Sequence, residues 1–330
     1  MLLTSLRRIL TAAAVLALVL AGAPAQAHHQ RPLIGSLSID IDRKGVDYTL
    51  LEVIYKLMAR GNVDAVLAFL DRDVEWKVEG VEGTVPFAGT FTGREGVRDY
   101  FEALSSSAII DELSLRYVVA QGDTVHLHFF ESGVALTTGK SFQMEIVQTW
   151  FFDHGRVVKF REFNDTFAMF AAFDTSWAPA YSMVANDADD GIVPSSFADP
   201  ISVASTQYAA IKNGDLPSFL GTISDDIIWI LAGPKDITPI AGTYYGLPGI
   251  YDFLNRLYST EAYVDFGPNY MISDGSRVDS QFFEIVYVYR TGRTFTCQGI
   301  HSANLNDAGK INSFRSYNDT YSVAMGHKFP

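Results

Sequence analysis

The stretch Phe160–Thr166, FREFNDT, returns 154 residues later as FRSYNDT, Phe314–Thr320. If this is a true repeat, the sequence upstream of both copies should match as well. It does: EWKVEGVEGTVPFAGTFTG at 75–93 aligns without a gap with IWILAGPKDITPIAGTYYG at 228–246. Solenoid repeats have periods of about 20–50 residues, so a period this long indicates one globular domain present twice.

Further matches extend the repeat along the whole unit. FFE at 129–131 aligns with FFE at 282–284, and TGKSF at 138–142 aligns with TGRTF at 291–295. The stretch between the copies is rich in Asp, Pro and Ser, which is typical of a linker. We therefore expect domains at 45–175 and 201–325, joined by a linker at 176–200.

The N-terminus has the pattern of an export signal. Arg7 and Arg8 precede an apolar run from Ile9 to Ala21, and AQA ends at Ala27. A transmembrane anchor is the alternative, but the run is short for one. We expect a signal peptide at 1–27 and an exported protein, periplasmic or secreted, with no membrane association after cleavage.

Charge and cysteine content exclude several classes of protein. The chain has a net charge of −13, and removal of the two signal arginines would make it −15. Such a chain is a poor partner for nucleic acid or anionic lipid, because phosphate contacts require clustered Lys and Arg. The single Cys297 cannot form an internal disulfide, so the domains must depend on their cores.

Each unit begins with helices and continues with strands. Apolar spacing predicts helices over 47–59 and 63–70, a strand over 74–78 and a third helix within 93–104. Four strands then follow, at about 113–120, 124–134, 140–152 and 156–164. This order predicts an α+β class of fold, with three helices packed on a strongly curved antiparallel sheet in each of two tandem domains.

The repeated phrases resemble those of the SnoaL-like, ketosteroid-isomerase-related proteins of the nuclear transport factor 2-like fold. They are PFAGTFTGREGV (86–97) and TGKSFQMEIVQTWFFDHGRVVKFREFNDT (138–166), with their second copies. The resemblance implies two cone-shaped domains, each with a cavity between sheet and helices. Members of this group isomerise, cyclise, dehydrate or hydrolyse small molecules without a cofactor, or only bind them. Single-domain relatives pair through their sheets, so the fusion implies an internal pseudo-dimer, compatible with a monomeric protein.

Strand alternation identifies polar residues on otherwise apolar faces. Gln148 is one in the first copy, and His301 occupies the same position in the second. Glu131 and Glu284 occupy equivalent positions on the preceding strand. If Thr291 and Gly292 form a two-residue turn, Glu284 and His301 are diagonal neighbours and could act as a general acid/base pair. The alternative is a core histidine and a glutamate turned to solvent.

Further candidate site residues lie at the end of the last strand, on the first strand and on the apolar strand faces. Asp319 either caps a closing helix or acts as a base at the cavity mouth, and Asp165 has the same alternatives. The remaining expected ligand-binding residues are Trp76, Trp229, Tyr244, Phe282 and Asn318.

His126 and His128 have the i, i+2 spacing of a metal pair. Their copies are Asp279 and Gln281, and no third ligand is evident, so the sequence favours two surface histidines and predicts no metal site.

The sequence therefore predicts an exported protein that binds a small apolar molecule of polyketide, terpenoid or steroid type. Cofactor-free isomerisation, cyclisation, dehydration or hydrolysis by His301, Glu284 and Asp319 is one hypothesis. A non-catalytic periplasmic or secreted binding module is the other, and the sequence leaves the choice open.

Overall fold

The computed structural model describes residues 32–39, 48–177 and 199–328. The expected signal peptide and most of the expected linker lie outside these residues. Within them, no helix has the length and apolar character needed to span a membrane.

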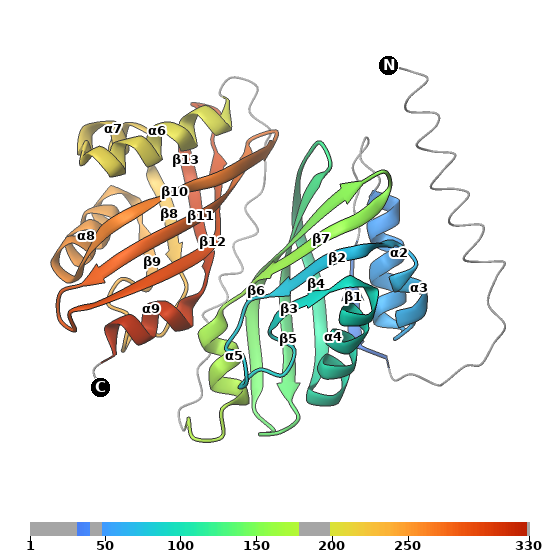
Figure 1. The fold of residues 1–330 in the computed structure, drawn as a ribbon. Helices are drawn as coiled ribbons and strands as arrows, with labels where there is room; N and C mark the ends of the chain where they lie inside the picture. The colour runs from blue at the N-terminus through green and yellow to red at the C-terminus, as the bar shows by residue number, and fades with distance from the viewer. Residues whose placement is uncertain (1–31, 40–47, 178–198, 329–330) are drawn as a thin grey trace, which may run out of the picture.

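The first domain contains one curved sheet with its first three helices on one face and its last helix toward the second domain (Figure 1). Its strands are ordered β1-β4-β5-β6-β7-β2-β3. The elements are β1 (Ile34–Ser38), α2 (Tyr48–Ala59), α3 (Val63–Leu67), β2 (Leu70–Val78), β3 (Gly89–Thr92), α4 (Gly93–Ser107), β4 (Ala108–Gln121), β5 (Thr124–Ala135), β6 (Ser141–Asp153), β7 (Arg156–Phe163) and α5 (Thr166–Phe173).

The second domain repeats this order as β10-β11-β12-β13-β8-β9. Its elements are α6 (Pro200–Asn213), α7 (Leu216–Gly221), β8 (Ile223–Leu231), β9 (Gly242–Tyr245), α8 (Gly246–Thr260), β10 (Glu261–Asp274), β11 (Arg277–Val288), β12 (Arg293–Leu305), β13 (Ile311–Asn318) and α9 (Thr320–His327). The α+β class and the two sheets agree with the prediction. The limits 45–175 and 201–325 remain those that the sequence predicts.

Two features of the sheets differ from the expectation. The sheets are mixed rather than wholly antiparallel, because β2 pairs with β7, and β8 with β13, in parallel. In addition, β1 extends the first sheet by pairing in parallel with β4. The sequence analysis did not predict β1.

An aromatic stack joins the two parallel strands in each domain. Trp76 lies on Phe160 with ring centroids 3.8 Å apart, and Trp229 lies on Phe314 at 3.6 Å. All four rings are buried. Each pair consists of register partners, so the stack fixes the pairing of the early strand with the last one and explains the phenylalanine that begins both copies of the repeated stretch.

A glycine begins the long helix of each domain. Gly93 and Gly246 have φ values of 69° and 62°, in the left-handed region that glycine adopts without strain. A side chain there would also lie 3.1 Å and 3.0 Å from the backbone oxygens of Arg72 and Asp225. The glycine that ends the 75–93 and 228–246 matches is therefore required by the turn from strand to helix.

The predicted hairpin register was wrong by two residues. The Ala135 N–H donates to the Lys140 carbonyl, so the loop is the four residues 136–139 instead of two. Glu131 consequently lies opposite Met144, and Glu284 lies opposite Cys297. A shift of two leaves every side chain on its predicted face but changes its neighbours.

The repeated NDT segments connect the domains by reciprocal hydrogen bonds. Thr166 donates its hydroxyl proton to Asp319 at 2.6 Å, and Thr320 donates to Asp165. The backbone N–H groups of Phe167 and Tyr321 donate to Thr320 and Thr166, each at 2.9 Å. The exchange fixes α5 against α9.

An apolar cluster beside these bonds has the same symmetry. It contains two buried residues from each domain, Val147 and Phe163 with Ile300 and Tyr317, which occupy equivalent positions. The faces of the sheets that carry them are therefore covered by the other domain.

His126 and His128 are not on the surface as the sequence analysis expected. Both side chains are fully buried at the domain boundary, where each lies within hydrogen-bond distance of Asp279. These side chains extend from the face of the sheet that is turned away from the first three helices. That face would be exposed in an isolated domain, but here the second domain covers it.

We predict that Thr320→Val and Thr166→Val each lower the free energy of unfolding by about 1–3 kcal/mol, because each removes a buried hydroxyl that both donates and accepts. Urea unfolding monitored by fluorescence provides the measurement. Two variants as stable as the parent protein would show that the reciprocal bonds do not hold the domains together.

Candidate functional site

A cavity of about 60 Å³ lies in the second domain, which is room for a few water molecules or a small apolar group. Sheet strands, α6, α8 and the 232–241 loop enclose it. Its apolar lining includes Trp229, Phe253, Leu257, Phe266 and Phe314. Its polar lining includes Gln207, Tyr208, Thr238, Glu261, Tyr263, Glu284, His301, Ser316 and Asn318.

Tyr208 and His301 form a hydrogen-bonded pair in this cavity. The Tyr208 hydroxyl lies 2.7 Å from Nδ1 of His301. The imidazole is stacked on Phe282 at a centroid distance of 3.6 Å. Burial lowers the pKa of His301 to about 3, so the ring is neutral near pH 7. The imidazole and the Tyr208 hydroxyl share a hydrogen bond, but the low pKa makes His301 a weak base toward a ligand.

Glu284 is one of two glutamates that line the cavity, the other being Glu261. Burial, and secondly the nearby charge of Glu261, raise the pKa of Glu284 to about 8, so it is mostly protonated at neutral pH. Glu261 itself lies 2.7 Å from Nε2 of His327. The cavity thus presents a carboxylic acid that can donate a proton.

The predicted contact between Glu284 and His301 is wrong, although both residues line the cavity. Ser280 lies opposite His301, and Glu284 is four residues further along β11. At about 3.3 Å per residue the two positions are roughly 13 Å apart along the strand. The two groups can act on different parts of one ligand but cannot act as a hydrogen-bonded pair.

The structure places the other predicted residues of the second domain as follows. Trp229 and Asn318 line the cavity. Phe282 supports the His301 ring, and Tyr244 donates its hydroxyl proton to the Ile240 carbonyl. For Asp319 the structure supports the helix cap and not the base at the cavity mouth. Its carboxylate accepts a hydrogen bond from Ser322 N–H at the start of α9 and another from the Thr166 hydroxyl, and it lines neither described pocket.

The first domain has a different polar network at the equivalent positions. Tyr55 donates to Gln148, whose amide donates to Glu162 at 2.7 Å. The indole of Trp150 donates to Tyr55 at 3.1 Å. In the second copy Trp150 is replaced by Ala303 and Glu162 by Ser316. The first domain therefore uses bulk and a hydrogen-bonded carboxyl group where the second has small side chains.

Exposure separates the two sets of residues. Tyr55, Gln148 and Glu131 are buried, and Trp76 is fully buried in its stack. Burial, followed by the charge of Glu162, raises the pKa of Glu131 well above its usual value. The second-domain counterparts Tyr208, His301 and Glu284 are only half-buried, because they face the cavity.

Sequence reasoning missed the two tyrosines. Tyr208 is the copy of Tyr55 at an offset of 153 residues, on the first helix of each unit. A tyrosine at the same helix position in both copies could have been predicted to bond to a polar residue of the sheet, since buried Tyr side chains need a hydrogen-bond partner.

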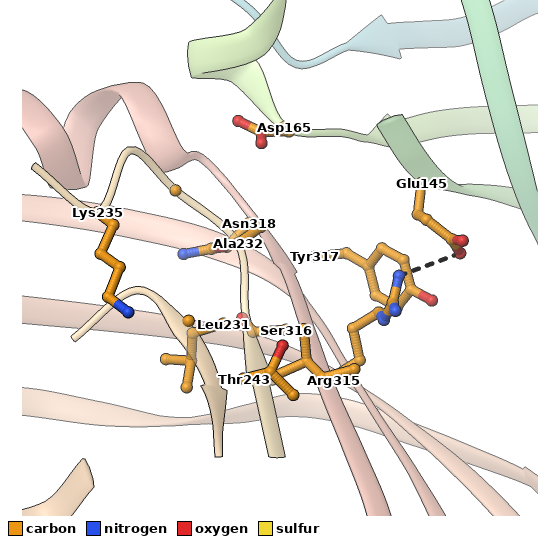
Figure 2. A pocket seen from close by; sticks show the side chains of 13 residues that line it. Glu145, Asp165, Leu231, Ala232, Lys235, Thr243, Arg315, Ser316, Tyr317 and Asn318 are labelled. Carbon is orange, nitrogen blue, oxygen red and sulfur yellow. Dashed lines mark ion pairs between the residues drawn. The ribbon is translucent and has the colours of Figure 1, made fainter. Parts of the chain in front are cut away.

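A second pocket, of about 260 Å³, is lined by residues of both domains (Figure 2). Leu231, Ala232, Ser316 and Asn318 line both spaces. The first domain contributes Glu145, which forms an ion pair of 3.2 Å with Arg315. The two spaces therefore share part of their walls, and the larger one lies at the domain boundary.

Residues 51–160 match the family model of the SnoaL-like domain. No curated protein matches the chain. Several solved structures are similar to part of it, all with low TM-scores. They include NTF2-like proteins from Burkholderia xenovorans LB400 (26% identity, TM-score 0.35, covering 38% of this chain and 95% of that one) and Burkholderia thailandensis E264 (28%, 0.34, 38% and 96%). An LEH-like epoxide hydrolase from M. tuberculosis is 16% identical, with a TM-score of 0.32, covering 39% of this chain and 88% of that one.

The family model covers most of the first domain, including the AGT motif and the TGKSF hairpin. The resemblance that the repeated phrases suggested is confirmed there: the chain contains a SnoaL-like domain at residues 51–160, and its second half repeats the strand order of that domain.

Proposed function

We propose that the second domain binds a small, largely apolar molecule and transforms it by acid-assisted chemistry without a cofactor. The observation that carries this proposal is the difference in exposure: Tyr208, His301 and Glu284 face a cavity, whereas their counterparts in the first domain are buried. A mostly apolar cavity with a few polar groups is the usual form of a small-ligand site.

The protonation states favour proton donation over proton abstraction. Glu284, with a pKa near 8, is a suitable acid at neutral pH and can protonate a carbonyl, epoxide or hydroxyl oxygen. His301, with a pKa near 3, is a poor acceptor of a substrate proton, so with Tyr208 it is better suited to hydrogen-bonding a substrate oxygen. Cyclisation, dehydration and hydrolysis fit this arrangement better than isomerisation through a carbanion.

The ligand class and the location are part of the same proposal. Aromatic walls formed by Trp229, Phe253 and Phe314 suit one ring of a molecule of polyketide, terpenoid or steroid type, and the cavity of about 60 Å³ must widen to admit such a molecule. Export is supported by the charge and apolar pattern of residues 1–27. A binding module without catalysis would use the same cavity.

Native mass spectrometry of the protein purified from its own cells would test both parts. We expect a chain that begins at His28 and carries a small molecule released on denaturation, because apolar ligands of enclosed cavities dissociate slowly. A membrane-bound chain that retains Met1 would contradict export, and a ligand-free chain that also fails to bind ring-containing apolar probes would contradict the proposed function.

The protonated state of Glu284 predicts a specific dependence of stability on pH. The folded pKa of about 8 exceeds the ordinary value of 4.5, so the folded protein binds this proton more tightly than the unfolded chain does. Its contribution is complete below pH 4.5 and is lost as the pH rises through 8, with a limiting slope of about 1.4 kcal/mol per pH unit.

The variant Glu284→Gln keeps a neutral side chain at every pH. We expect the free energy of unfolding of the parent protein, relative to this variant, to fall between pH 5 and pH 8, as measured by urea unfolding. Glu102→Gln, which changes an exposed residue of α4, is the control. A constant difference between parent and Glu284→Gln would show that Glu284 is ionised in the folded protein.

A further inference from the structure

Three fully buried side chains from both domains meet at the domain boundary, away from the cavity. His126 and His128 extend from β5, and Asp279 extends from β11. Oδ2 of Asp279 lies 2.9 Å from Nδ1 of His126 and 2.6 Å from Nε2 of His128. The three potential ligand atoms all lie within 4.8 Å of one another, and no other group of three His, Cys, Asp or Glu residues within the described ranges has this spacing.

The position of the cluster follows from the repeat. Asp279 is the copy of His126, at an offset of 153 residues, and the two strands that carry them meet across the boundary. In a dimer of identical domains, residues related in this way would be identical. A fused chain removes that restriction, so an acidic residue on one copy can face two imidazoles on the other.

The donor atoms are those of a transition-metal site. Two imidazole nitrogens and one carboxylate oxygen suit zinc and its neighbours in the first transition row, which bind such atoms at about 2.0–2.2 Å. The atoms already converge, and slight separation of the two short contacts would make room for an ion. Oδ1 of Asp279, buried and without a hydrogen-bond partner among the described residues, is available as a further ligand.

The surrounding groups are compatible with metal ligation. Nε2 of His126 lies 3.3 Å from the Tyr270 hydroxyl, so a His126 that bound metal through Nδ1 would donate its remaining N–H to Tyr270. Histidine ligands usually have such a partner; His126 has one, whereas Nδ1 of His128 has none among the described residues. The Arg277 guanidinium lies 3.4 Å from the Tyr117 ring centroid, and His128 stacks on the same ring at 4.0 Å. An aromatic ring therefore lies between this cation and His128.

We propose that His126, His128 and Asp279 bind one divalent transition-metal ion of the zinc class and that this ion joins the two domains. Because all three side chains are inaccessible to solvent, the ion stabilises the pairing of the domains and is not open to substrate. The site is independent of the cavity at Tyr208, and either proposal can fail without the other.

Zinc binding by the mature protein tests the site. After dialysis against zinc and then against metal-free buffer, elemental analysis should find about one more zinc per chain in the parent protein than in Asp279→Asn or His128→Gln. The difference is the relevant quantity, because His28 and His29 near the expected N-terminus can bind metal in every variant. Glu145→Gln, which loses a boundary ion pair but no ligand, should retain the zinc.

A second measurement does not depend on the folding of any variant. Cobalt(II) added to the metal-free parent protein should give the visible absorption of a protein-bound, low-symmetry ion, and zinc should abolish it and raise the melting temperature. Equal zinc contents in the parent protein and Asp279→Asn, or no cobalt spectrum and no thermal shift, would overturn the proposal. The cluster would then be a metal-free carboxylate bridging two histidines.

Discussion

The arrangement of the two domains depends on the exchange of hydrogen bonds between two copies of one tripeptide. In each copy the aspartate caps its own helix and the threonine bonds to the aspartate of the other copy. The same residues thus end the last strand, begin the last helix and connect the domains. Because these bonds are buried and reciprocal, neither domain can shift along the boundary without leaving polar groups unpaired.

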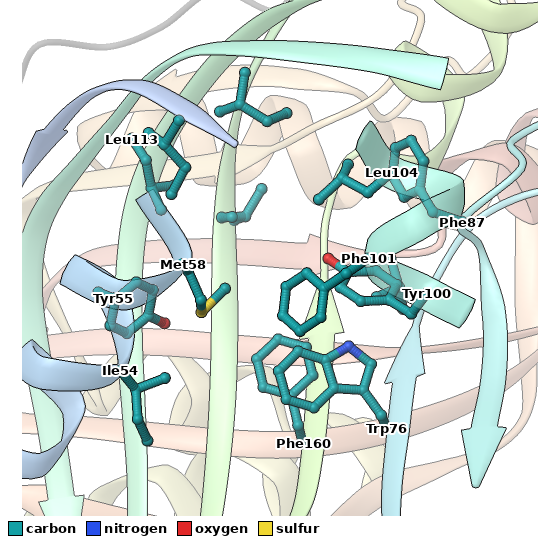
Figure 3. Packing of buried hydrophobic residues seen from close by; sticks show 14 of the residues in the cluster. Ile54, Tyr55, Met58, Trp76, Phe87, Tyr100, Phe101, Leu104, Leu113 and Phe160 are labelled. Carbon is teal, nitrogen blue, oxygen red and sulfur yellow. The ribbon is translucent and has the colours of Figure 1, made fainter. Parts of the chain in front are cut away.

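This constraint leaves the space between sheet and helices free to differ between the two domains. The Trp–Phe stack and the strand-to-helix glycine are present in both domains, so both retain the framework (Figure 3 shows Trp76 and Phe160 within the first core). The positions between sheet and helices differ. A tyrosine bonded to glutamine in the first domain corresponds to a tyrosine bonded to histidine in the second. The first copy fills this space with buried side chains, and the second leaves a cavity there.

Much of the fold could be predicted from the sequence because the repeat confirmed each motif independently. Alternation placed Gln148, His301, Glu131 and Glu284 on the correct faces, since a strand has only two. The sequence could not give the register, because a Thr–Gly pair does not distinguish a two-residue turn from the four-residue loop that forms. The contact between Glu284 and His301 failed for that reason.

Residues whose neighbours come from the other domain were the hardest to predict. His126 and His128 lie on a face that the pattern of one domain assigns to solvent, and only the pairing of the domains buries them. Asp319 was ambiguous for the same reason, because its partner Thr166 belongs to the other copy. The fusion implied an internal pseudo-dimer, and applying its symmetry to position 126 would have identified Asp279 as the facing residue.

The central claim is that the second domain alone contains the working cavity, and a matched pair of variants tests it most directly. Tyr208→Phe and Tyr55→Phe each remove one hydroxyl at equivalent positions. Titration calorimetry with the molecule that co-purifies should show about tenfold or greater weakening for Tyr208→Phe, in line with the loss of one buried polar contact of about 1.4 kcal/mol or more, and unchanged affinity for Tyr55→Phe. Weakened binding in Tyr55→Phe with normal binding in Tyr208→Phe would place the site in the first domain and contradict the account.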